Sequence, residues 1–136
     1  MGDINLRTKI NNLDEKVDEN TKSIADLNTK KYFKSQCTLV QQSDYEVTIE
    51  EAILLGNIAL MTVSIKSLTQ ESYPTGQTWK PIITLPFKNK GILTKTIISR
   101  NGDYKQLEIS CNNSNQVLIR GGSIDSNYTD TILLLK

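Results

Sequence analysis

Apolar residues recur every three or four positions between Leu6 and Leu27, the spacing of one face of an α-helix. Counted in sevens, they fill the two core positions of a coiled-coil heptad, with Asn20 as the one polar interruption. The first core position holds Ile10, Val17 and Ile24, and the second holds Leu6, Leu13, Asn20 and Leu27. An isolated polar helix with such a stripe is marginal in water, so the pattern predicts association with other copies of the chain.

The periodicity changes after residues 28–31, where short runs of β-branched and aromatic residues alternate with turn residues. Strands are expected at Tyr32–Leu39, Tyr45–Ile49, Ile58–Ile65, Pro81–Leu85, Leu93–Ser99, Tyr104–Cys111, Gln116–Arg120 and Thr129–Leu135. The two clearest hairpins turn at Asn101-Gly102 and through Asn112–Asn115, whereas Glu50-Glu51 is expected to begin a loop.

These patterns define two parts of the chain. Residues 1–30 are expected to form an N-terminal α-helical coiled-coil stalk. Residues 31–136 are expected to form an all-β head, an antiparallel β-sandwich or jelly roll. The heptad begins close to Met1, which is typical of a piece trimmed from a longer protein or of a small accessory subunit.

Two features of the sequence bear on the number of helices in the coiled coil, and they point in opposite directions. β-branched residues at the first core position with Leu at the second favour a dimer. The segment Val17-x-x-Asn20-Thr21 instead resembles a heptad of the trimeric stalks of bacterial surface adhesins and phage tail fibres. That resemblance implies three Asn20 amides meeting on a threefold axis. We expect a homotrimer, and a polar interruption in a dimeric coil is the alternative.

Composition narrows the choice of partners. The hydrophobic fraction of 38% is low for a monomer but ordinary for a subunit that shares a core, and the net charge of +1 gives no reason to expect nucleic acid. No apolar segment resembles a signal peptide, and the longest apolar run, Ile53–Ile65, is too short to cross a membrane. We expect no membrane insertion and a protein made in a cytoplasm.

Cys37 and Cys111 are the two cysteines, and the chain has no histidine. A zinc site would need both thiols and additional carboxylates, so no metal and no cofactor are expected. The two cysteines are predicted to be small buried hydrophobic residues, and a disulfide between strands is the alternative.

Three segments of the predicted head resemble the C-terminal heads of receptor-binding proteins in the baseplates of siphophages that infect Gram-positive hosts. They are Gly56–Ile65, Trp79–Pro86 with its Trp-x-x-Ile-x-Thr-Leu-Pro core, and Leu107–Ile109 followed by Gln116–Ile119. The resemblance implies a homotrimer located at the phage tail tip, attached to other baseplate or tail proteins. It also implies β-sandwich heads that bind host cell-wall saccharide.

Two other classes of function are alternatives to a saccharide-binding receptor-binding protein. Without histidine, catalysis would fall to a carboxylate pair of the glycosidase type. The candidates are Asp44, Glu50, Glu51, Asp103, Glu108, Asp125 and Asp130. None is marked by its neighbours, so we expect no enzyme, with a glycan hydrolase as an alternative. The other alternative is a trimerisation or capping domain that binds no ligand.

Saccharides are bound by stacking on aromatic rings and by hydrogen bonds to charged and amide side chains. The residues predicted for this role are Trp79, Arg100, Asp103, Tyr104 and Arg120, and the further candidates are Tyr73, Tyr128, Asn112 and Asn113. For Trp79 the competing interpretation is core or interface packing, and for the segment around Asn101-Gly102 it is an ordinary solvated turn.

Overall fold

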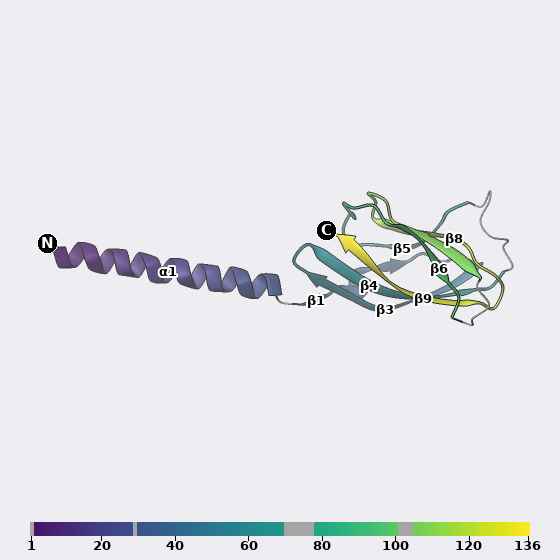
Figure 1. Ribbon diagram of the computed structural model, residues 1–136, viewed down its shortest axis with the longest axis horizontal. Coiled ribbons are helices and arrows are strands. Elements are labelled where there is room, and N and C mark those ends of the chain that lie inside the picture. Colours follow the sequence, from purple (N-terminus) through teal and green to yellow (C-terminus); the bar gives the residue numbers. More distant parts are fainter. Residues whose placement is uncertain (1, 29, 70–77, 101–104) are drawn as a thin grey trace.

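The computed structural model describes residues 2–28, 30–69, 78–100 and 105–136. The predicted helix is confirmed as α1 (Gly2–Asn28), which projects away from the β-rich head as a straight rod (Figure 1). Leu6, Ile10, Leu13 and Val17 lie on α1 with 48–61% of their surface exposed. The side chains of Ile24 and Leu27 lie outside those that the structure describes. Within the described residues, no helix has the length and apolar character that crossing a membrane requires.

The head consists of two antiparallel sheets that face each other (Figure 1). The four-stranded sheet has the order β1 (Lys31–Tyr32), β3 (Tyr45–Leu55), β4 (Ile58–Ser67), β9 (Asn127–Leu135). The five-stranded sheet has the order β2 (Thr38–Leu39), β5 (Lys80–Thr84), β8 (Gln116–Gly121), β7 (Gln106–Ser110), β6 (Thr94–Ile98). The expected all-β head behind an N-terminal helix is therefore present.

The core fills the space between the two sheets because inward and outward residues alternate along the strands. On β4, Ala59, Met61, Val63 and Ile65 point inward and are at most 2% exposed. The five-stranded sheet contributes side chains that are fully buried: Ile83, Leu107, Ile109, Val117 and Ile119. Burying each large side chain contributes roughly 1.5–3 kcal/mol, which makes this layer the main source of stability.

The predicted strand Tyr32–Leu39 is wrong as a single element. The chain instead forms β1, a 3-10 turn η1 (Lys34–Gln36) and β2, and the two short strands belong to different sheets. The break occurs at Phe33, whose side chain is 3% exposed and whose backbone N–H donates to the Ala52 carbonyl at 3.1 Å. Burial of this ring fixes one end of the turn that carries the chain from one sheet to the other.

The predicted loop at Glu50-Glu51 is also wrong, because β3 continues through it to Leu55. The pairing of β3 with β4 shifts register between Ile49 and Glu51, which is a β-bulge that lets the strand absorb an extra residue. The hairpin then turns at Gly56, whose φ of 59° lies in the left-handed region that glycine tolerates.

Asn89 is a polar residue within the head and is only 1% exposed. Its side-chain oxygen accepts the backbone N–H groups of Leu135 at 2.8 Å and Gly91 at 3.2 Å. Its amide nitrogen donates to the Cys111 carbonyl at 2.5 Å. One side chain therefore joins the end of β9 to the segment that follows β7.

The two cysteines are free thiols, so the alternative of a disulfide between them is not realised. Cys111 is fully buried, as predicted, and Cys37 is half-buried. Burial raises the pKa of both thiols, and for Cys111 a hydrogen bond with Asn89 offsets part of that increase in pKa.

These pKa shifts predict slow alkylation of the folded protein. At about pH 8, iodoacetamide should modify Cys37 slowly and Cys111 only after unfolding, because the thiolate is the reactive form. Raising the pH should accelerate the reaction of Cys37, since the thiolate fraction increases toward its raised pKa. Mass spectrometry of peptides taken over time, with a denatured sample as control, measures both rates. Fast labelling of Cys111 in the folded protein would contradict its burial.

Candidate functional site

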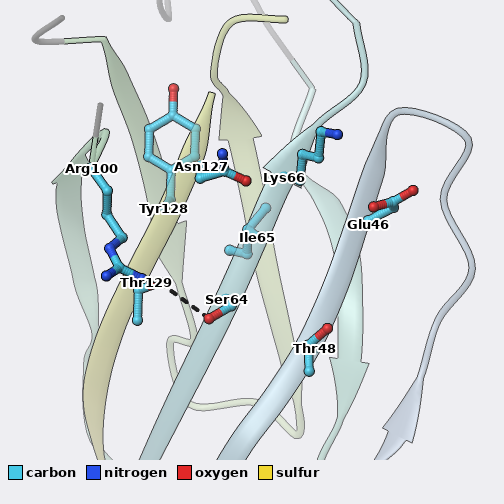
Figure 2. A pocket seen from close by; sticks show the side chains of 9 residues that line it. All are labelled: Glu46, Thr48, Ser64, Ile65, Lys66, Arg100, Asn127, Tyr128 and Thr129. Carbon is cyan, nitrogen blue, oxygen red and sulfur yellow. Dashed lines mark hydrogen bonds between the residues drawn. The ribbon is translucent and has the colours of Figure 1, made fainter. Parts of the chain in front are cut away.

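A polar groove lies on the outer face of the four-stranded sheet (Figure 2). It lies where β3 begins, β4 ends and β9 begins, and this end of the head is remote from α1 in Figure 1. The antiparallel register places its side chains in two rows across the sheet. Glu46, Lys66 and Asn127 form the first row, and Thr48, Ser64 and Thr129 form the second. All six point outward because they occupy the positions between the buried residues of β3, β4 and β9.

Arg100, one of the predicted saccharide-binding residues, lies along one side of this groove (Figure 2). It follows β6, and its backbone N–H donates to the Asn127 carbonyl at 2.8 Å, which fixes it beside β9. Its guanidinium donates to the Thr129 hydroxyl at 3.4 Å, and that hydroxyl also pairs with the Ser64 hydroxyl at 3.1 Å. Ser64 and Thr129 of the second row are thereby held in one network with Arg100.

The groove has a volume of about 530 Å³. Besides its two rows and Arg100, it is lined by the buried residues Ile65 and Tyr128. It offers hydroxyls that donate and accept, an amide, one carboxylate and two cations. Such a set of groups can bind a polyhydroxylated ligand through several hydrogen bonds. Two of the donors in the groove, Lys66 and Arg100, are charged. Among the described residues of the lining, Glu46 is the only carboxylate, so the glycosidase pair is not found there.

Trp79 and Arg120, two further predicted residues, lie together on the outer face of the five-stranded sheet. The Arg120 guanidinium carbon stands 4.3 Å from the centre of the Trp79 ring, and its Nε donates to Glu108 at 2.6 Å. One face of the ring is thus already covered by a cation that has its own carboxylate partner. The groove beside Arg100 lies on the four-stranded sheet, so Trp79 and Arg120 are not part of it.

The remaining candidates are distributed as follows. Asp103, Tyr104 and Tyr73 lie outside the described residues. Tyr128 is fully buried, so its ring offers no free stacking surface. The Asn112 side-chain oxygen accepts the Leu93 N–H at 2.9 Å, which stabilises the turn after β7, and Asn113 sits in that turn with a φ of 48°.

Some of the candidate catalytic carboxylates form ion pairs with other described residues. Asp44 pairs with Lys80, Asp130 with Lys95, and Glu108 with Arg120. Glu50 is the extra residue of the β3 bulge and Glu51 follows it, and both are exposed. Asp125 lies in the turn before β9, and Asp103 is outside the described residues. In the described part of the chain, no three side chains of His, Cys, Asp or Glu are grouped as a metal site would require.

The sequence predicted Arg100 as a binding residue but not the six residues in the two rows. Those residues belong to stretches in which polar and apolar residues alternate on three strands. They became a site only through the pairing of β4 with β9, which joins segments about sixty positions apart in the sequence.

The fold assigns the protein to a structural class only, an antiparallel two-sheet head that follows an N-terminal helix. No protein-family profile, no curated protein and no solved structure matches this chain. Its function is therefore inferred from its own residues and geometry.

Proposed function

We propose that this protein is a homotrimeric, non-enzymatic adhesin of a phage tail tip. Its helices form a three-stranded stalk, and its heads bind host cell-wall saccharide in the polar groove. It would be made in the host cytoplasm and carried on the virion, attached to other tail or baseplate proteins. The observation that carries the proposal is the polar groove at the end of the head farthest from the helix.

The chemistry of the groove supports a saccharide as ligand. A cell-wall saccharide presents many hydroxyls and, in anionic polymers, phosphates or carboxylates. Lys66 and Arg100 supply charged donors for such groups, while Glu46 and the Thr and Ser hydroxyls can accept from sugar hydroxyls. Hydrogen bonds from charged groups are roughly twice as strong as neutral ones, so the two cations are expected to dominate the binding energy.

The exposed stripe of α1 supports the oligomeric part of the proposal. Leu6, Ile10, Leu13 and Val17 are uncovered in the single chain, although a helix of this polarity gains most of its stability from burying its apolar face. A parallel three-stranded coil buries this stripe and aligns the three heads in one direction. The grooves then lie at the end opposite the stalk, where a host surface can reach them.

The first test is binding of labelled protein to isolated Gram-positive cell walls. Arg100→Ala and Lys66→Ala should each weaken binding by about tenfold or more, because each removes a charged hydrogen-bond donor from the groove. Lys90→Ala is the matched control. Its side chain is exposed, and its backbone N–H pairs with the Leu135 carbonyl at the end of the head near the stalk. This variant loses the same charge away from the groove and should bind as the wild type does.

The outcome discriminates between the three functions considered for this chain. Equal loss of binding in all three variants would indicate nonspecific attraction between cations and an anionic wall. No binding by the wild type would favour a capping domain without a ligand. Release of soluble sugar from the walls would establish a glycan hydrolase instead.

A further inference from the structure

The outer face of the four-stranded sheet is divided into a polar half and an apolar half. The polar half contains the groove, and the apolar half lies where β3 joins β4 and β9 ends. Figure 1 shows that these strand ends lie next to α1. We call this half the apolar face. It consists of Tyr32, Ile53, Leu55, Ile58, Leu60, Leu133 and Leu135.

Strand pairing places these side chains in two adjacent rows. One row runs across all four strands, from Tyr32 through Ile53 and Leu60 to Leu133, and the other joins Leu55, Ile58 and Leu135. Tyr32 is 67% exposed and Leu133 is 52% exposed, so these are large side chains open to water. Contiguous apolar surface of this kind on a soluble head marks an interaction site, whereas isolated exposed apolar residues do not.

We propose that the apolar face packs against two further copies of this chain around the threefold axis of the trimer. This inference rests on the proposed homotrimer and adds to it the head surface that the subunits share. The polar groove lies beyond the packed surface on the same sheet. It remains available for ligand at the tip of the head.

The apolar face begins four residues after α1, and this short connection indicates that its partner is another copy of this chain. Tyr32 follows Asn28, the last residue of α1, by four positions, and four residues span at most about 14 Å. Parallel association of the helices therefore brings the apolar faces of neighbouring heads close together. Tethering of this kind raises the effective concentration of one face near another to the order of millimolar, which favours packing between copies over capture of a different protein.

The chemistry of the apolar face also suits self-association. None of its seven side chains carries a charge, so identical faces meet without repulsion between like charges. The exposed stripe of α1 has the same property at Leu6, Ile10, Leu13 and Val17. Stalk and head thus offer two apolar surfaces joined by a short segment, and one set of partners buries both.

The experiment compares Leu60→Glu with Ile98→Glu in the full chain, by sedimentation over a range of protein concentrations. Both residues point outward from a strand, with 41% of Leu60 and 54% of Ile98 exposed, but Ile98 lies on β6 of the other sheet. Leu60→Glu should raise the concentration at which half the trimer dissociates by about tenfold or more, since a carboxylate would be buried at each contact. Ile98→Glu should leave that concentration unchanged. Circular dichroism verifies that both heads are folded.

A trimer that dissociates equally in the wild type and in Leu60→Glu would overturn the apolar face as an interface and leave the stalk trimer standing. A wild type that is monomeric at every concentration would overturn the homotrimer itself, and with it this inference.

Discussion

Replacing Asn89 with leucine should lower the free energy of unfolding of the head by about 3 kcal/mol or more. The substitution removes the acceptor for the Leu135 and Gly91 N–H groups and the donor to the Cys111 carbonyl. Each buried polar group left without a partner costs roughly 1–3 kcal/mol. Thermal denaturation should show a midpoint at least about 10 °C below that of the wild type.

The matched control for this prediction is Asn115→Leu. Asn115 is exposed in the turn after β7, and its backbone carbonyl, which accepts the Leu85 N–H at 2.7 Å, is retained in the variant. Its effect should stay within about 0.5 kcal/mol, as for most surface substitutions. Similar melting of Asn89→Leu and Asn115→Leu would show that the hydrogen bonds of Asn89 are not essential to the head.

Asn20→Ile should have a large effect of the opposite sign, raising the melting temperature of the stalk. In the proposed trimer three Asn20 amides meet in one core layer, and burying an amide without full hydrogen bonding costs roughly 1–3 kcal/mol. Isoleucine removes that cost and adds apolar contact. It should also relax the register of the coil, because a polar layer is what fixes the alignment of the helices.

The control for the stalk is Asn12→Ile. Asn12 is also exposed on α1 but lies one residue before the core position of Leu13, on the outer side of the heptad. Its replacement should leave the melting temperature nearly unchanged. Denaturation followed by circular dichroism compares the variants, and crosslinking through one introduced cysteine reports the register. A lower melting temperature for Asn20→Ile would place Asn20 outside the core and overturn the heptad assignment.

The sequence predicted those features of the fold that depend on local periodicity. The heptad pattern located α1, and the alternation in Leu107-Glu108-Ile109 located β7 with its buried and exposed faces. It failed where tertiary packing competes with local preference. Phe33 interrupts an extended run because its ring is buried. Glu50 and Glu51 lie within β3 at its β-bulge, although glutamate is less common in strands than in other structures.

The candidate site was harder to predict, for a related reason. Arg100 was identified because it borders a turn, which is a local property. Its neighbours Ser64 and Thr129 come from strands far apart in the sequence, and only the register of β4 with β9 brings their hydroxyls within 3.1 Å. Conversely, Trp79 and Arg120 were expected to face a ligand, and the structure places each against the other.

The pairing of β4 with β9 also affects how the protein is made. Until β9 has been synthesised, the backbone groups along one edge of β4 have no strand to pair with, although α1 and the β3–β4 hairpin are already complete. Long-range pairing of this kind closes slowly compared with local helix formation. If the stalks associate first, three unfinished heads wait side by side, each with an open edge and each able to accept the β9 of its neighbour. In the proposed trimer, the order of stalk association and head closure would then determine whether each subunit keeps its own final strand or exchanges it.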